Sequence, residues 1–211
     1  MVDLRLRRGA VVESMLFARF PRVDGFLDFK SPFQLLVAVV LSARCTDVQV
    51  NRVTPALFAV APDARSMADL PLMRLEELIH GVGFFRQKAR ALSSLSKILI
   101  NRWNGTVPMT FEDLESLPGV GHKTTSVVLG LCTDRPTFPV DTHVYRLSRR
   151  WQLSNGRTPI AVERDLKQIF SPEKWFPLHQ RMIAYGRTDC TARACDGTRC
   201  TICKAIQALA N

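Results

Sequence analysis

The residues best suited to chemistry lie in the stretch Leu117–Thr124, which reads Leu-Pro-Gly-Val-Gly-His-Lys-Thr. Its two glycines, Gly119 and Gly121, allow backbone conformations in which a side chain would clash. The pattern predicts the end of one helix, a tight hairpin and the start of a second helix. The first turn of that second helix presents unpaired N–H groups and the positive end of its dipole, which together attract a phosphate. The spacing alone therefore indicates an anion-binding hairpin.

Lys123 falls in the first turn of the second helix, where its amine would lie close to a phosphodiester backbone and to a sugar carbon. Most lone lysines are simply solvated, and a cation at a helix N-terminus is disfavoured by the dipole. The same positive field, together with partial burial, would favour the neutral amine, which is a nucleophile. Lys123 is therefore the candidate nucleophile.

Asp141 is the second candidate catalytic residue and lies in the segment Pro139–Val144. Aspartate is a favoured N-cap residue, so the plainest interpretation is that it caps the helix that follows. A carboxylate that faces Lys123 would instead stabilise a cationic sugar or assist proton transfer. One residue can serve both purposes.

Four of the six cysteines crowd together near the C-terminus with the spacing Cys-x4-Cys-x4-Cys-x2-Cys: Cys190, Cys195, Cys200 and Cys203. In a reducing compartment such crowding indicates a metal rather than disulfides. Four thiolates suit tetrahedral zinc or a [4Fe–4S] cluster. Zinc ribbons usually carry two Cys-x2-Cys pairs, and only one is present here, so the pattern favours the cluster and leaves zinc as the alternative. Arg193 lies among these cysteines and would present positive charge to phosphates.

The bulk composition narrows the class of protein. The chain has 211 residues, with 29 Lys and Arg against 19 Asp and Glu, for a net charge of +10. This balance favours polyanions, of which nucleic acid is the commonest. The longest apolar run, Leu35–Leu41, is too short to cross a membrane, and no secretory signal is recognisable. We expect a cytoplasmic protein, associated with the nucleoid if prokaryotic.

Nearly every segment shows helical periodicity and none alternates as a strand does, so we expect an all-α protein. The expected helices cover residues 11–20, 33–43, 46–58, 69–80, 85–103, 111–117, 123–133, 141–151, 160–170 and 175–186. The stretch 133–139 is interpreted as a crossing between two lobes. Lys123 and Asp141 would then lie on opposite sides of a cleft.

Taken together, the motifs resemble the endonuclease III family of the helix-hairpin-helix DNA glycosylase superfamily. The segments that carry the resemblance occur in the family's order, and they are Leu41–Asp47, Gly83–Ala89, Asn104–Pro108, Leu117–Thr124, Val140–Val144 and the cysteines that follow Tyr185–Arg187. Any one of them is a weak signal, whereas the ordered set is specific.

The resemblance implies a two-lobed helical fold with DNA in the cleft between the lobes. A six-helix barrel with the hairpin would cover 25–135, and a lobe with a [4Fe–4S] cluster loop at 190–203 would combine 1–24 and 136–211. The implied activity is base excision repair of double-stranded DNA: release of oxidised pyrimidines, followed by β-elimination at the abasic site. We expect a monomer, because one cleft grips one duplex. A damaged base must leave the stack to be reached, and damage weakens its stacking.

The resemblance also assigns roles to residues. Lys123 would attack C1′ to form a Schiff base, which distinguishes this chain from superfamily branches that lack the lysine and only release the base. Asp141 would assist departure of the base. The hairpin, Gly119, Val120 and Gly121, would hold a phosphate without reading sequence.

The chain departs from the family pattern at the positions expected to contact the lesion. Arg44 stands where the family typically has a glutamine that inserts into the DNA gap, and Phe84 stands where it has a leucine wedge. An aromatic wedge would stack in the vacated space, and Arg44 would contact the orphaned base or a phosphate. His143 falls at another lesion-side position. In the cysteine motif, Cys195 is additional and no cysteine follows Cys203.

Two alternatives remain at this point. One is the same fold with a shifted substrate, either pyrimidine dimers or abasic sites alone. The other is a non-catalytic DNA-binding protein whose cluster senses redox state, in which Lys123 is a phosphate contact only.

Overall fold

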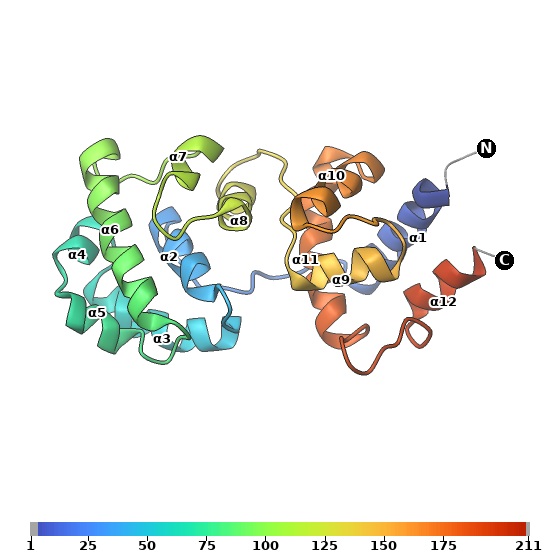
Figure 1. Ribbon diagram of the computed structural model, residues 1–211, viewed down its shortest axis with the longest axis horizontal. Coiled ribbons are helices and arrows are strands. Elements are labelled where there is room, and N and C mark those ends of the chain that lie inside the picture. The colour runs from blue at the N-terminus through green and yellow to red at the C-terminus, as the bar shows by residue number, and fades with distance from the viewer. Residues whose placement is uncertain (1–3, 210–211) are drawn as a thin grey trace. The chain divides into compact units, whose positions relative to one another are not determined.

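The computed structural model describes residues 4–209, which form twelve α-helices joined by loops, with no strand (Figure 1). The prediction of an all-α protein is confirmed. Internal contacts divide the chain into two compact units. We call Gly25–Asp134 the hairpin unit, and Met1–Asp24 together with Arg135–Asn211 the cysteine unit. None of the helices in residues 4–209 is both long and apolar enough to cross a membrane.

Helix α2 (Pro32–Ser42) is the centre of the hairpin unit. Its start is defined by Ser31, whose side chain accepts a hydrogen bond from the Gln34 N–H, and by the proline at its first position. Every residue from Phe33 to Leu41 is buried. A helix that is apolar on all sides needs partners on all sides. Helices α3 (Asp47–Val60), α6 (Phe85–Trp103) and α8 (His122–Cys132) provide them.

The helix predicted over 69–80 is shorter in the structure, and a separate helix that was not predicted precedes it. Helix α4 (Ala64–Asp69) begins at a capping box between Asp63 and Ser66 and packs along α6 (Figure 1). Helix α5 (Leu72–Leu78) follows Pro71. The prediction was wrong because the residue before a proline is disfavoured in the helical region, which ends α4 and forces a new start. Helix α7 (Phe111–Glu115) then leads to α8.

The cysteine unit contains α1 (Leu4–Arg19), α9 (Thr142–Arg150), α10 (Pro159–Ile169), α11 (Pro172–Thr188) and α12 (Thr201–Ala208). Helix α11 packs against α9 and α1, and the fully buried side chains include Trp151, Tyr185 and Phe138. Two predictions are corrected here. Helix α1 extends back to Leu4 because arginine is a good helix former even without an apolar stripe. Helix α12 was missed because a cysteine, Cys200, serves as its N-cap.

Candidate nucleic-acid site and candidate metal centre

The two glycines of the hairpin are required for different reasons. Gly119 has φ of +78°, in the left-handed region, and a Cβ there would lie 3.0 Å from the Ala91 Cβ. Gly119 is therefore needed by the turn itself and by its close approach to α6. Gly121 has an ordinary φ of −107°, and a Cβ there would meet no heavy atom within 4 Å. The space over Gly121 is open, as an approaching ligand requires.

The middle residue of the hairpin has a structural role. The side chain of Val120 is 7 % exposed, and its N–H donates to the Leu117 carbonyl at 3.1 Å. The amides of Gly119 and Gly121 donate to no acceptor among residues 4–209. The amides of both glycines are therefore available to an anion, whereas the amide of Val120 is not.

Lys123 is the second residue of α8, and its side chain is exposed. The residue before it, His122, is fixed against α7: its Nδ1 lies 2.8 Å from the Glu115 carboxylate, and its ring stacks on Phe111 at 5.3 Å. The start of α8 is thus tied to α7 through His122. The partial burial expected for Lys123 is not provided by the described residues.

Asp141 is the N-cap of α9, and its Oδ1 accepts a hydrogen bond from the Val144 N–H at 2.8 Å. The capping interpretation is therefore confirmed. No described residue donates to the second carboxylate oxygen, Oδ2. Asp141 is half-buried. It belongs to the cysteine unit and Lys123 to the hairpin unit, so a facing pair stays a prediction.

Immediately after Asp141, the start of α9 and the end of α11 enclose a basic pocket of about 460 Å³. It is lined by Thr142, His143, Arg146, Gly186, Arg187, Thr191 and Ala192. Arg146 lies one helical turn after His143, and it donates to the Gly186 carbonyl at 3.0 Å and to the Cys190 carbonyl at 2.6 Å. Gly186 leaves space for both side chains, because a Cβ there would lie 2.9 Å from the His143 Nδ1. Positive charge and hydroxyl groups in one concave site suit a phosphate.

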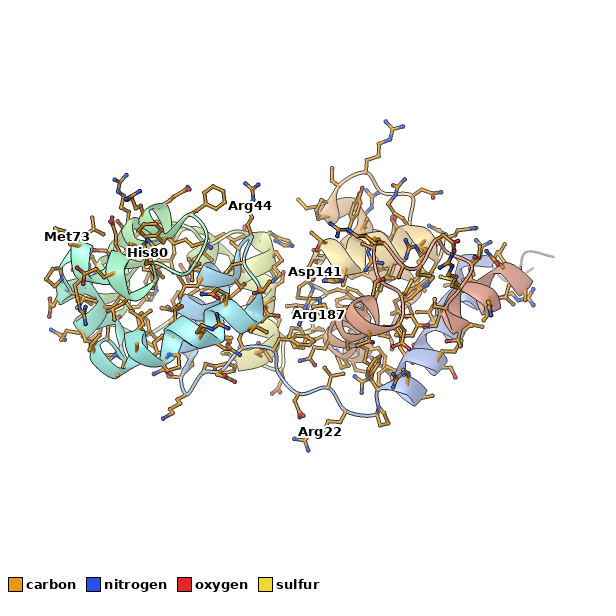
Figure 2. The ribbon with its side chains drawn as sticks, turned by 90° about the horizontal axis from the view of Figure 1, so that it is seen from below. Arg22, Arg44, Met73, His80, Asp141 and Arg187 are labelled. Atoms are coloured by element: carbon orange, nitrogen blue, oxygen red, sulfur yellow. The ribbon has the colours of Figure 1, made fainter. Side chains whose placement is uncertain are left out.

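Arg44 and Phe84 are brought together on the surface of the hairpin unit. The Arg44 guanidinium lies over the Phe84 ring, 4.9 Å from its centroid, and Phe84 is 57 % exposed. Figure 2 shows Arg44 projecting from the ribbon. Both residues have left-handed backbones, with φ of +54° and +60°. Such strain in non-glycine residues clusters at functional sites, and an exposed aromatic ring stacks readily on a base.

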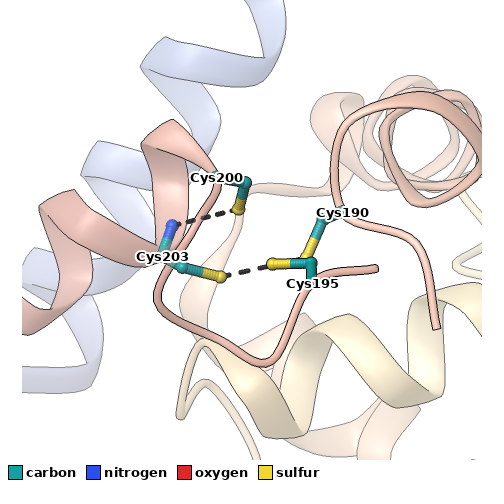
Figure 3. A group of neighbouring side chains, drawn as sticks. All are labelled: Cys190, Cys195, Cys200 and Cys203. Atoms are coloured by element: carbon teal, nitrogen blue, oxygen red, sulfur yellow. Dashed lines mark hydrogen bonds between the residues drawn. The ribbon is translucent and has the colours of Figure 1, made fainter. Parts of the chain in front are cut away.

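The four C-terminal cysteines converge on one buried site (Figure 3). Cys190 follows α11, Cys195 lies in the loop, and Cys200 and Cys203 come from the first turn of α12. Arg150 donates to the Cys190 Sγ at 3.2 Å and to the Thr191 carbonyl at 3.1 Å. The hydrogen bond with Cys203 and the guanidinium of Arg150 lower the pKa of the Cys190 thiol to about 5. A thiol that ionises this easily is prepared to be a metal ligand. Arg193 is exposed on the same loop.

The spacing of the sulfur atoms can be compared with the two candidate centres. All four Sγ atoms lie within 4.8 Å of one another, and those of Cys190 and Cys203 are 3.8 Å apart. A single ion with bonds of about 2.3 Å separates tetrahedral sulfur ligands by about 3.8 Å. A [4Fe–4S] cube, with one iron per cysteine, separates them by about 6 Å. The donor set fits either centre, and a cube requires the loop to open by about 1–2 Å.

The sequence interpretation missed two arginine residues that the structure places in these sites. Arg146 was recognisable only as a residue one turn after His143. Arg150 carried no local signal, because its partner, Cys190, lies forty residues away in the sequence.

Comparisons with known proteins agree with this geometry. Residues 37–172 match the family model described as HhH-GPD superfamily base excision DNA repair protein. Endonuclease III of Treponema pallidum is 45 % identical over 192 residues, covering 91 % of this chain and 90 % of the relative. Endonuclease III of Synechocystis is 41 % identical over 191 residues, covering 89 % and 86 %.

Solved structures give the same result. The structure described as a trapped endonuclease III–DNA covalent intermediate, an estranged-adenine complex, has a TM-score of 0.89 and is 35 % identical, covering 98 % of this chain and all of that one. A thermostable thymine-DNA glycosylase, 19 % identical with a TM-score of 0.80, covers 95 % of this chain and 94 % of its own and shares the fold.

The fold and the matched model define a base excision DNA repair protein with a helix-hairpin-helix. The chain belongs to the HhH-GPD superfamily and, within it, to the endonuclease III family. It is therefore an enzyme, a DNA glycosylase of base excision repair.

Proposed function

We propose that this protein is a bifunctional DNA glycosylase and abasic-site lyase that excises oxidised pyrimidines from duplex DNA. The observation that carries the proposal is the position of Lys123. Its amine extends from the first turn of α8, beside a glycine hairpin whose open amides suit a phosphate. A nucleophile beside a bound phosphate is within reach of the sugar attached to it.

The proposed reaction begins when the neutral Lys123 amine attacks C1′ of the flipped nucleotide. The new N–C1′ bond replaces the glycosidic bond, and the base departs with the electron pair and takes up a proton. Opening of the sugar ring gives a Schiff base. Loss of a proton from C2′ then expels the 3′ phosphate, and hydrolysis of the Schiff base releases the lysine.

Asp141 supports this sequence through its second oxygen. One oxygen is used by the helix cap, which fixes the carboxylate, and the other would stabilise the cationic sugar and assist proton transfer. The same hydrogen bond that caps the helix would therefore also orient the carboxylate for catalysis. The basic pocket beginning at Thr142 is the proposed seat for a flanking phosphate.

Borohydride trapping tests the lysine mechanism. A duplex with thymine glycol and a duplex with an abasic site are each incubated with wild type, Lys123→Gln and a control, Lys97→Gln, at an exposed position of α6. The proposal is supported if wild type and the control are trapped on both duplexes and Lys123→Gln is trapped on neither. Trapping on the abasic duplex alone would retain the lyase and assign the base specificity elsewhere. No trapping with intact DNA binding would contradict the lysine mechanism.

A shifted substrate is the second candidate function, and the Arg44–Phe84 pair favours it. A guanidinium stacked on an aromatic wedge presents a different surface to the lesion from that of a glutamine and a leucine. A panel of duplexes with oxidised pyrimidines and pyrimidine dimers separates the two candidates, because a shifted enzyme releases the dimer and leaves thymine glycol intact.

We further propose that Cys190, Cys195, Cys200 and Cys203 hold a [4Fe–4S] cluster, in agreement with the family. When bound, the cluster would be structural, since neither base release nor elimination transfers an electron. Zinc is the second candidate, and the 3.8 Å separation of two sulfur atoms favours it. A purified protein that is yellow-brown with four irons supports the cluster, and a colourless protein with one zinc contradicts it.

A further inference from the structure

Lys88 is a buried ammonium group that the proposed chemistry does not use. It lies in the first turn of α6 and is only 7 % exposed. Its Nζ donates to the Leu41 carbonyl at 2.8 Å and to the Ala43 carbonyl at 2.7 Å, at the end of α2. Those carbonyls belong to the last turn of a helix, where acceptors lack partners and a cation is favoured.

The environment of Lys88 is costly for a charge. No carboxylate among residues 4–209 pairs with its ammonium group. Desolvation lowers the pKa of Lys88, which means that burial disfavours its charged form. An apolar residue would avoid that cost. The ammonium therefore has a purpose that depends on its two hydrogen bonds.

The two side-chain hydrogen bonds tie the end of α2, which directly precedes Arg44, to the first turn of α6, which follows Phe84. Arg44 directly follows Ala43, whose carbonyl Lys88 holds. Phe84 lies one turn before Lys88, and its carbonyl accepts the Lys88 N–H at 3.1 Å. Lys88 thus contacts both left-handed loops, which lie forty residues apart in the sequence. In this arrangement the Arg44 guanidinium lies over the Phe84 ring.

We propose that Lys88 is a positioning residue, which holds Arg44 and Phe84 as a pre-assembled wedge for the gap left by an extruded base. This inference rests on the proposed function, since it assumes that the enzyme flips a damaged nucleotide. Extruding a base breaks its stacking, and an aromatic side chain already in position replaces that stacking. A wedge that must first be ordered would recover less of the lost stacking free energy, because ordering its side chains costs entropy.

The test compares one lesion in two contexts. Single-turnover base release is measured with thymine glycol in a fully paired duplex and in a three-nucleotide bubble, where the lesion is already unstacked. Lys88→Met removes the donors and keeps the volume. We expect it to slow release from the paired duplex by about 10- to 100-fold, the range that one stacked base contributes, and from the bubble by less than about threefold.

Four further variants sharpen the comparison. Phe84→Ala should reproduce the dependence on context, and the double variant with Lys88→Met should be no slower than the slower single variant. Lys97→Met, on the exposed side of the same helix, should behave as wild type. Lys88→Gln keeps a donor near the two carbonyls and carries the test if Lys88→Met fails to fold, as circular dichroism would show.

Each outcome decides the matter. If Lys88→Met slows base release equally on both substrates, Lys88 acts on the fold or on the chemistry, and the positioning role is overturned. Unchanged release from the paired duplex by Lys88→Met also overturns it. Trapping of wild type on a preformed abasic site is measured in parallel. If wild type neither traps nor releases base, the proposed function fails and this inference fails with it. If wild type is active and only the context dependence is missing, the inference fails alone.

Discussion

Alanine substitutions at the two hairpin glycines should have opposite effects on stability and on DNA binding. Gly119→Ala forces a side chain into a left-handed backbone at φ of +78° and against the Ala91 Cβ at 3.0 Å. Gly121→Ala meets neither obstacle, because its φ is −107° and no heavy atom lies within 4 Å of the new Cβ. We expect the first variant to be unstable and the second to be stable but to bind DNA weakly.

The magnitudes follow from those two geometries. A left-handed backbone costs about 1–2 kcal/mol for an L-residue, and overpacking costs about 1–3 kcal/mol. Gly119→Ala should therefore lower the free energy of unfolding by about 2–5 kcal/mol, which shifts the melting temperature by at least about 4 °C in a chain of this length. Gly121→Ala loses only the modest N-cap preference of glycine over alanine, about 1 kcal/mol.

Binding should reverse that order. The Gly121→Ala methyl group would occupy the open space where a phosphate is proposed, and losing one charge-assisted hydrogen bond weakens binding on the order of tenfold. Urea titration followed by circular dichroism gives the stabilities. Fluorescence anisotropy with an abasic-analogue duplex, at a temperature where both variants are folded, gives the affinities. Equal destabilisation by both substitutions would refute the assignment of the turn strain to Gly119, and wild-type affinity of Gly121→Ala would refute the phosphate site.

Three further perturbations probe other parts of the chain. Gly186→Ala should change the free energy of unfolding by no more than about 2 kcal/mol, since a gain in helix propensity offsets the clash with His143, yet it should weaken DNA binding in the anisotropy assay. Asp63→Ala should cost about 1 kcal/mol at pH 7 by removing a helix cap. The Ser66 hydrogen bonds lower the folded-state pKa of Asp63 below 3.8, so in urea titrations across pH this difference is complete above about pH 4 and vanishes as the pH falls through the folded-state pKa. Cys195→Ser should reduce the bound metal measured by elemental analysis, whereas Cys45→Ser should leave it unchanged; full metal content in Cys195→Ser would show that the fourth ligand lies elsewhere.

Much of this protein could be predicted from local patterns. The helix expected over 33–43 is α2, because Ser31 and Pro32 are typical helix-start residues and the apolar run that follows them is typical of a buried helix. The glycine spacing of Leu117–Thr124 predicted the hairpin and placed Lys123 at the start of the next helix. These predictions succeeded because helix starts, turns and burial depend on hydrogen bonds and on apolar faces within a few residues of one another. The new helix start at Pro71 was missed although proline is a local signal, whereas α12 was missed because cysteine is not a usual N-cap residue.

The tertiary structure alone decided which distant side chains meet. In the sequence, Arg44, Phe84 and Lys88 are separate residues. Only the packing of α6 against α2 brings the Lys88 ammonium to the carbonyls at the end of α2 and the Arg44 guanidinium over the Phe84 ring. Arg150 likewise meets Cys190 only because α9 packs against α11. Contacts of this kind depend on how whole helices pack, and a sequence pattern records the periodicity of each helix without recording which residue of its neighbour it will touch.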